Sequence, residues 1–337
     1  MAKYRIQKEL LHKKRLGKNT FSNRLVYREQ VTLGYATEVF HYTSPEGLMG
    51  ILKSREIFFT DSQFLNDYNE RFDINSELKF FWDSKYREYD KDFYSLIRNI
   101  YVDSYEDNNY AYIDKETPEE VCRYFILSAS MNSDSLSLWK YYSKNGTYNG
   151  YSMGLYIPAL TDEWIDRETG VAVETGLVIY SSNKKQEKIS NMIETLYEVW
   201  CTYKRSDEMD CKVCKEYKAW ISYASLFFKK QCFSAEEEMR FVATIRKNEL
   251  NNLFYELDNG NKIKMYAFRN VGGVITPYIK MPLFGWSDET SWVTSNVVVG
   301  PCMDYSQKKD GILRFVDSLD YKFHDLHVKE SEIPVRY

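Results

Sequence analysis

The sequence lacks a long apolar run, and this sets the first limit on where the protein acts. Across its 337 residues no uncharged stretch approaches the length of a membrane-spanning helix, and no apolar segment typical of a secretory signal follows the amino terminus. The six cysteines are irregularly spaced, as in proteins of a reducing compartment and unlike a disulfide framework. We therefore expect a cytoplasmic protein without membrane contact.

Several common catalytic signatures are also missing. The sequence has no P-loop, no His-Glu-x-x-His pair and no internal repeat, which argues against the usual ATPase and metalloprotease hypotheses. It has no G-x-S-x-G elbow, so a serine hydrolase built on His41 ranks last among the enzyme hypotheses. Gly146, Gly150 and Gly154 do not have the spacing of a G-x-G-x-x-G dinucleotide fingerprint.

Residues that bind metals are sparse. Cys211 and Cys214 supply two thiolates, but a structural zinc site needs four ligands, and cysteines three residues apart are neighbours on any helix. His324 and His327 have a helical spacing, yet they lie beside a predicted strand without further ligands, so we expect them at the surface or at a sheet edge. The sequence predicts no metal site, and it leaves open whether the cysteine pair binds metal.

The charge is unevenly distributed along the chain. The net charge is −4, but the first 29 residues carry nine Lys or Arg and two Glu, so the remainder is strongly acidic. We expect residues 1–35 to form a basic arm, either contacting an acidic partner such as nucleic acid or lying as a solvated helix on the acidic body. Residues 36–337 are expected to form one domain, with amphipathic helical insertions at about 68–115 and 184–230.

The stretch 39–70 predicts a strand, a helix and a second strand. Ser44 and Pro45 mark a helix start, with a hydroxyl at the cap and proline at the first helical position. His41 closes the first strand immediately before this helix, which places it on a rim rather than in a core. We therefore treat His41, Tyr42 and Thr43 as candidate site residues.

A second informative stretch follows a predicted buried strand at 124–130. A short helix at 134–142 carries Trp139 and Tyr142, and a strand at 151–157 follows a glycine-containing turn. The two aromatic rings could stack on a flat ligand ring, or they could pack the helix against the sheet. Further strands are predicted at 171–180, 262–268, 274–282, 295–301 and 321–323, with a helix at 305–318.

A third stretch places charged side chains on one face of a strand. Glu236, Glu238 and Arg240 alternate with Met239 and Phe241, so the charged and apolar groups point to opposite faces. Two carboxylates and a guanidinium are costly to bury unless they pair or bind a ligand. The alternative is a surface ladder of salt bridges with little effect on stability.

These motifs together resemble a known family. From about Thr37 to its carboxyl end, the chain resembles the bacterial family catalogued as domain of unknown function twenty-nine seventy-one. The His-x-Thr start and the Glu-x-Glu-x-Arg motif are in turn distantly similar to ADP-ribosyltransferases that hold NAD with a histidine. The resemblance rests on His41-Tyr42-Thr43, the helix GLMGILKS, the strand FFTD, Leu65-Asn66-Asp67 with Glu70, Ser128, Trp139, Tyr142, Gly150, Glu236, Glu238, Arg240 and the strand VVVGP.

The resemblance implies an ADP-ribosyltransferase-like α+β fold with a curved, mostly antiparallel split sheet, inserted helices and a site between the two sheets. It implies NAD as cofactor. NAD would be held by His41, Tyr42, Thr43, Trp139, Tyr142 and Arg240, the last meeting the pyrophosphate or merely holding Glu238 in place.

The resemblance also implies that Glu238, Glu236 and His41 are catalytic. Glu238 would bind the nicotinamide ribose hydroxyl and stabilise positive charge on the sugar, and Glu236 would orient or deprotonate the acceptor. The acceptor would be nucleic acid or protein, and the family's occurrence suggests a toxin or anti-phage effector. Two alternatives stay open: an effector that hydrolyses NAD, and a non-enzymatic nucleic-acid or protein-binding module with a degenerate site. The sequence leaves the oligomeric state undetermined.

Overall fold

The chain forms two compact units in the computed structural model, which describes residues 38–65, 70–102, 122–142, 149–156, 171–202, 206–256, 260–283, 294, 296–320 and 326–334. Residues 70–102, 181–202 and 206–228 form a helical unit, and the other described residues form a sheet unit. The predicted basic arm lies outside the described residues, as do Asn66, Asp67, Gly146, His324 and the strand expected at 321–323.

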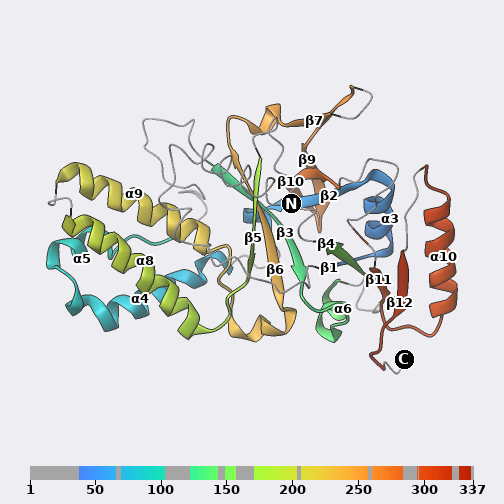
Figure 1. Ribbon diagram of the computed structural model, residues 1–337, viewed down its shortest axis with the longest axis horizontal. Helices are drawn as coiled ribbons and strands as arrows, with labels where there is room; N and C mark the ends of the chain where they lie inside the picture. Colours follow the sequence, from blue (N-terminus) through green and yellow to red (C-terminus); the bar gives the residue numbers. More distant parts are fainter. Residues whose placement is uncertain are drawn as a thin grey trace, which may run out of the picture. The chain divides into compact units, whose positions relative to one another are not determined.

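The helical unit brings together the two segments that the sequence predicts as helical insertions. Buried aromatic rings hold its helices together: Trp82 meets Tyr89 with ring centroids 5.6 Å apart, and Phe93 meets Trp200 at 5.4 Å. Such pairs stabilise a core beyond the area that they bury. The helices of this unit are α4 (Asp73–Lys85), α5 (Lys91–Ile97), α8 (Ser182–Thr202) and α9 (Asp207–Ala224), with 3-10 turns η2 (Glu70–Phe72) and η3 (Tyr86–Glu88) (Figure 1).

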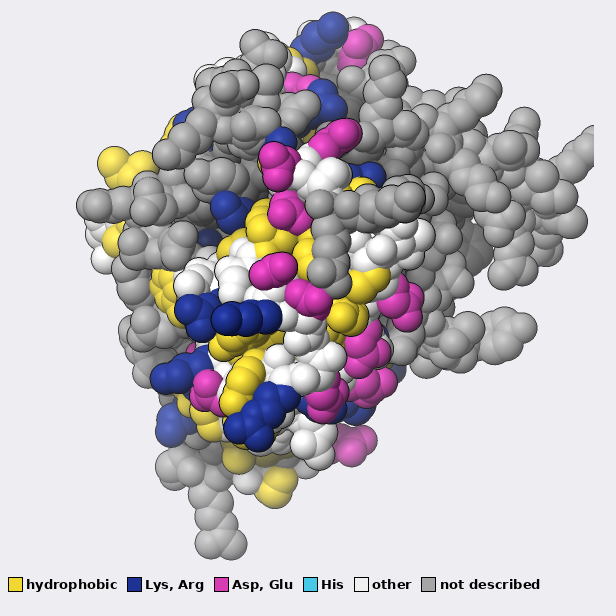
Figure 2. Space-filling model, turned by 90° about the vertical axis from the view of Figure 1, so that its left-hand side faces the viewer, with side chains coloured by type: hydrophobic (Ala, Val, Ile, Leu, Met, Phe, Trp, Pro, Cys, Tyr) yellow, Lys and Arg dark blue, Asp and Glu magenta, His cyan; other side chains and the backbone are white. Residues whose placement is uncertain are grey.

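The face drawn in Figure 2 carries side chains of both charges. Figure 2 shows Lys and Arg intermixed with Asp and Glu on this face, with apolar side chains between them. Binding to a nucleic-acid backbone uses a surface of predominantly positive charge. The described part of this face therefore gives no support to the nucleic-acid-binding alternative.

The sheet unit is built on ten strands that pair mainly antiparallel. The strands follow the order β12-β11-β4-β1-β3-β2-β10-β9, with β6 on the other side of β3 and β5 beside β6. Among the described strands only β11 and β12 pair in parallel. The strands are β1 (Glu38–Thr43), β2 (Glu56–Asp61), β3 (Cys122–Ser130), β4 (Tyr151–Tyr156), β5 (Ala172–Leu177), β6 (Glu238–Arg246), β9 (Tyr266–Val271), β10 (Val274–Pro282), β11 (Asn296–Val299) and β12 (His327–Glu330).

Three helices and a small hairpin complete the sheet unit. Helix α10 contacts β11 and β12 (Figure 1), and the hairpin pairs β7 with β8. The elements are α3 (Pro45–Ser54), α6 (Leu136–Tyr142), α10 (Tyr305–Asp317), β7 (Phe254–Glu256) and β8 (Lys262–Lys264), with 3-10 turns η1 (Ser62–Phe64), η6 (Gln231–Glu236) and η7 (Leu250–Asn252).

The α+β class and the mostly antiparallel sheet agree with the sequence prediction, but the sheet is uncurled where a curved one was expected. The predicted strand 262–268 is divided between β8 and β9 at Met265, whose N–H bonds the carbonyl of Leu253. His327 is exposed on β12, the last strand of the sheet, which agrees with its predicted place at a sheet edge.

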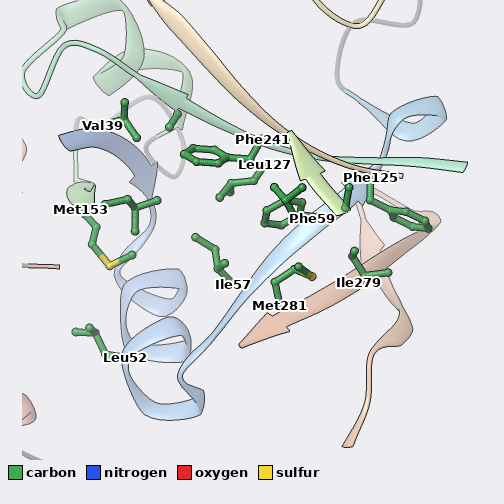
Figure 3. Close-up of a cluster of buried hydrophobic side chains, with 14 of the residues drawn as sticks. Val39, Leu52, Ile57, Phe59, Phe125, Leu127, Met153, Phe241, Ile279 and Met281 are labelled. Atoms are coloured by element: carbon green, nitrogen blue, oxygen red, sulfur yellow. The ribbon is translucent and has the colours of Figure 1, made fainter. Parts of the chain in front are cut away.

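The hydrophobic core lies on one face of the sheet. The alternation of β6 sends Met239 and Phe241 into this core, while Glu238 and Arg240 point to the other face, as the sequence predicts. Helix α3 adds Leu48 to the same core. Figure 3 shows ten of the core residues: Val39, Leu52, Ile57, Phe59, Phe125, Leu127, Met153, Phe241, Ile279 and Met281.

Two strands share one edge of β3. Strand β1 pairs with it through Phe40 and Ser130, while β2 pairs through Thr60 with Ile126 and through Asp61 with Phe125. The other edge of β3 is paired with β6 along its whole length. In the described ladder, residues 127–129 thus have no strand partner on the first edge, and we call this gap the β3 fork.

Candidate functional site

A cavity of about 670 Å³ adjoins the β3 fork. This volume is within the range of sites for small molecules and cofactors. All the lining residues belong to the sheet unit and come from β1, β2, β3, α3, α6, β6, β9, β10 and the turns beside them. The site residues predicted from the sequence that line it are His41, Tyr42, Thr43, Tyr142, Glu236 and Glu238.

His41 occupies the β3 fork and takes the place of a missing strand partner. Its Nδ1 lies 3.0 Å from the carbonyl oxygen of Ser128, which can only accept a hydrogen bond, so Nδ1 carries the hydrogen. Burial lowers the pKa of His41, and the positive charge of Arg269 lowers it further, so the ring is neutral at pH 7. Nε2 is then an acceptor, and in the described part of the chain it makes no hydrogen bond.

The end of β1 and the start of α3 meet closely beside His41. Ser44 caps α3 by accepting a hydrogen bond from the N–H of Gly47 at 3.1 Å, and Pro45 is the first helical residue, as predicted. A side chain on Gly47 would clash with the hydroxyl of Thr43, so this glycine permits the approach. The cavity wall at this point is therefore formed by Thr43 and the first turn of α3.

Tyr42 and Trp139 hold the turn before α6 and the helix itself in place. The Tyr42 hydroxyl donates to the carbonyl of Asn132 at 2.9 Å and accepts from the N–H of Ser135 at 2.8 Å, which fixes the turn before α6. Trp139 packs edge-on against Tyr42, with its indole N–H bonded to Asp134 at 2.7 Å. Trp139 is 1% exposed and does not line the cavity. It packs α6 against the sheet, which is one of the two roles that the sequence left open for it.

Tyr142 is the aromatic residue of α6 that lines the cavity. Its side chain is 41% exposed, so one part of the ring is open to a ligand. Burial of the hydroxyl raises its pKa to about 12, and the negative charges of Glu238 and Glu236 act in the same direction. The Tyr142 hydroxyl therefore stays protonated at physiological pH and lies near both carboxylates.

The turn that leads into β6 is held in an uncommon conformation. Glu237 has φ 44° and ψ 46°, the left-handed region that a residue other than glycine rarely adopts. The Ser130 hydroxyl donates to the Glu236 carbonyl at 2.7 Å, and the N–H of Met131 donates to the Glu237 carbonyl at 2.9 Å. These bonds fix the position of Glu236, which ends η6 rather than extending β6 as the sequence suggested.

Four charged residues, which we call the Glu238 cluster, form a buried network beside the cavity. Arg240 binds Glu238 through two bonds, Nε to Oε1 at 2.7 Å and Nη2 to Oε2 at 3.0 Å. Lys229 Nζ lies 3.1 Å from Glu238 Oε2 and 2.6 Å from Glu236 Oε2. The cluster has two positive and two negative groups, and mutual pairing offsets the cost of burying them.

The two glutamates differ in what they can offer a ligand. A carboxylate has about four acceptor positions, and Glu238 uses three of them for two bonds from Arg240 and one from Lys229. The carboxylate of Glu236 bonds only Lys229 in the described part of the chain, and it lines the cavity with its side chain 14% exposed. The sequence expected Glu238 to bind a ribose hydroxyl, but the geometry makes Glu236 the carboxylate that is open to a ligand.

Ser128 joins the two predicted motifs. Its carbonyl accepts the hydrogen bond from His41, and its hydroxyl is near enough to Glu238 to lower the pKa of that carboxyl. Both groups therefore lie beside the same residue of β3, although the motifs lie far apart in the sequence. The resemblance included Ser128 as a strand-ending serine, but its contacts depend on the pairing of β3 with β6 and could not be read from local pattern.

The charge of Glu238 makes stability depend on pH. Burial alone would raise its pKa, but Arg240, Lys229 and Ser128 outweigh burial and lower the pKa from 4.5 to about 2. The folded state therefore binds fewer protons than the unfolded state between these values. We expect about 3 kcal/mol of stability to be present above pH 4.5 and lost as the pH falls towards 2.

Urea unfolding at a series of pH values tests this expectation. The free energy of unfolding of the wild-type protein should fall on acidification more steeply than that of Glu238→Gln, because the variant has no proton to bind at this position. The stability difference between the two proteins should thus narrow from pH 5 to pH 2. A difference that stays constant over this range would show that Arg240 and Lys229 do not stabilise the ionised carboxylate.

Other candidate groups are placed outside this site. Cys211 and Cys214 lie on α9 in the helical unit, and within the described residues no group of three His, Cys, Asp or Glu is arranged to hold a metal ion. None of the described helices is both long and apolar enough to cross a membrane. Arg240, predicted as a cofactor-binding residue, is 2% exposed and does not line the cavity, so it holds Glu238.

Comparisons of the chain with family models, with curated proteins and with solved structures found no match. The family resemblance therefore rests on the sequence motifs alone, and an argument about function depends on the cavity and the residues that line it.

Proposed function

We propose that the cavity binds NAD and that the protein is an ADP-ribosyltransferase, cleaving the bond between nicotinamide and ribose and passing the ADP-ribose to an acceptor. The observation that carries the proposal is that His41 and Glu236, from two motifs far apart in the sequence, line one cavity of suitable volume. Ser128 fixes His41 by a hydrogen bond, and Lys229 fixes Glu236. A convergence of polar groups in a well-formed cavity is the usual starting hypothesis for an active site.

The residues present suit the binding of a ribose and a flat ring. Neutral His41 offers Nε2 as an acceptor for a sugar hydroxyl, because its other nitrogen is committed to Ser128. The Thr43 hydroxyl lines the same wall. Tyr142 presents an aromatic surface on which the nicotinamide ring would stack.

The carboxylates suit the chemistry of glycosidic cleavage. When bound, NAD supplies a C–N bond whose breaking develops positive charge on the ribose. Glu236 would face that charge with its unoccupied oxygen and would then orient the acceptor nucleophile. Glu238 would hold Lys229, which in turn fixes Glu236, so in this proposal Glu238 is a positioning residue.

The reaction products distinguish transfer of ADP-ribose from hydrolysis of NAD. Incubation of the protein with NAD labelled in the adenylate portion should release nicotinamide and, with bacterial protein or nucleic acid present, should label one of these macromolecules. Free ADP-ribose without labelled product would instead identify an NAD-hydrolysing effector. Absence of nicotinamide release with both classes of acceptor would contradict the proposal and would favour a binding module with a degenerate site.

A further inference from the structure

Arg269 lines the same cavity but belongs to none of the motifs predicted from the sequence. It lies on the exposed strand β9, and its guanidinium extends over the aromatic rings of Phe58 and Tyr278, at 5.8 and 5.4 Å from their centroids. Nη2 donates a hydrogen bond to the Thr60 hydroxyl at 2.8 Å. The side chain is thus held in one position by three residues of β2 and β10, and one bond leaves most of its N–H groups unassigned.

The charge of Arg269 has no carboxylate partner in the described part of the chain. This contrasts with Arg240, whose guanidinium is paired with Glu238. Partial burial of the guanidinium against the rings lowers the pKa of Arg269, although the residue is exposed and water solvates part of its charge. Lys280 lines the cavity as a second cation, while the carboxylate Glu56 accepts a hydrogen bond from the Tyr255 hydroxyl.

A guanidinium fixed on aromatic rings is suited to bind a phosphate. Its planar set of N–H donors matches two oxygens of a phosphate, and stacking on Phe58 and Tyr278 orients the plane before a ligand arrives. Little side-chain freedom then remains to be lost on binding, which favours affinity. Thr60 and Lys280 supply further donors beside it.

We propose that Arg269, assisted by Lys280, is the phosphate-binding residue of the cavity, and that it selects ligands carrying a pyrophosphate over unphosphorylated nucleosides. The inference refines the substrate class of the proposed NAD site, but it does not depend on any bond being cleaved there. Arg269 then binds the pyrophosphate, which is one of the two roles that the sequence suggests for Arg240.

The distance between Arg269 and the Glu238 cluster fits a ligand of dinucleotide length. Glu238 pairs with Ser130, whereas Thr60, which Arg269 bonds, pairs with Ile126, four residues along β3. Their strands β6 and β2 flank β3, so usual sheet spacings separate the two positions by on the order of 15 Å. Arg269 and His41 both line the cavity, so a ligand that reaches from Arg269 to the Glu238 cluster would pass the β3 fork.

Isothermal titration calorimetry with ADP-ribose and with adenosine tests the proposal. Arg269→Gln should weaken the binding of ADP-ribose by about tenfold to a hundredfold, the value of one or two charge-assisted hydrogen bonds, and should leave adenosine within about twofold. Arg269→Lys should lose less, because it keeps the charge without the planar fork. Arg314→Gln is the matched control, since Arg314 is an exposed residue of α10 paired with Asp310.

Three outcomes would overturn the proposal: unchanged ADP-ribose affinity in folded Arg269→Gln, equal wild-type affinity for adenosine and ADP-ribose, or no wild-type binding of either ADP-ribose or inorganic pyrophosphate. The test is separable from the proposed activity. Binding of ADP-ribose that depends on Arg269, in a protein that releases no nicotinamide from NAD, would support the phosphate site and contradict the transferase. Nicotinamide release that is insensitive to Arg269→Gln would support the transferase and contradict the phosphate site.

Discussion

Glu236→Gln is expected to lower the rate of nicotinamide release by about a hundredfold to a thousandfold, the usual effect of removing one electrostatic contact to a charged transition state. Glu236 is the carboxylate with an unoccupied oxygen facing the cavity. The amide keeps its shape and removes its charge, so the loss should appear in kcat more than in KM. The protein should remain folded, because Lys229 keeps its bond to Glu238 when Glu236 loses its charge.

The matching substitution Glu238→Gln should affect stability as well as rate. It leaves Arg240 and part of the Lys229 charge buried without their partner, and breaking a buried ion pair of this kind costs about 3–5 kcal/mol. Glu249→Gln is the control for both variants, since Glu249 forms only an exposed pair with Arg246. Nicotinamide release that is unchanged in folded Glu236→Gln would show that the cluster is structural and that the catalytic group lies elsewhere.

His41→Ala is expected to remove measurable NAD binding while leaving the protein folded. The substitution deletes the Nε2 acceptor from the cavity and leaves the Ser128 carbonyl in the β3 fork without its partner. The second effect should lower the free energy of unfolding by about 1–3 kcal/mol, which a domain of this size tolerates. His327→Ala is the control, because His327 is exposed on β12.

Calorimetric titration of both histidine variants with NAD, alongside urea unfolding, checks this expectation. The wild-type protein and His327→Ala should bind NAD equally. Unchanged NAD affinity in folded His41→Ala would mean that His41 serves only to fill the gap in the ladder, and would remove the main support for the ribose-binding role.

The parts of the fold that depend on local pattern could be predicted from the sequence. Ser44 and Pro45 mark the start of α3 because capping and proline geometry act within one helical turn. The alternation around Met239 and Phe241 identified both faces of β6, because the side-chain period of a strand is fixed by its backbone. Such features need no knowledge of which strands pair.

The features that depend on pairing could not be predicted. Whether Trp139 stacks on a ligand or on Tyr42 depends on where α6 packs. The helical spacing of its aromatic residues is the same in both cases. The division of roles between Glu236 and Glu238 depends on Lys229 and on the Ser128 hydroxyl from β3. Arg269 stands in no motif at all, since only the pairing of β9, β10 and β2 brings it over Thr60.

The central claim is that NAD occupies the cavity beside the β3 fork, and crystals grown with NAD test it most directly. We predict electron density for the nicotinamide ribose between His41 Nε2 and Glu236, with the pyrophosphate at the Arg269 guanidinium. An empty cavity in crystals grown with millimolar NAD, or NAD bound elsewhere on the protein, would contradict the claim.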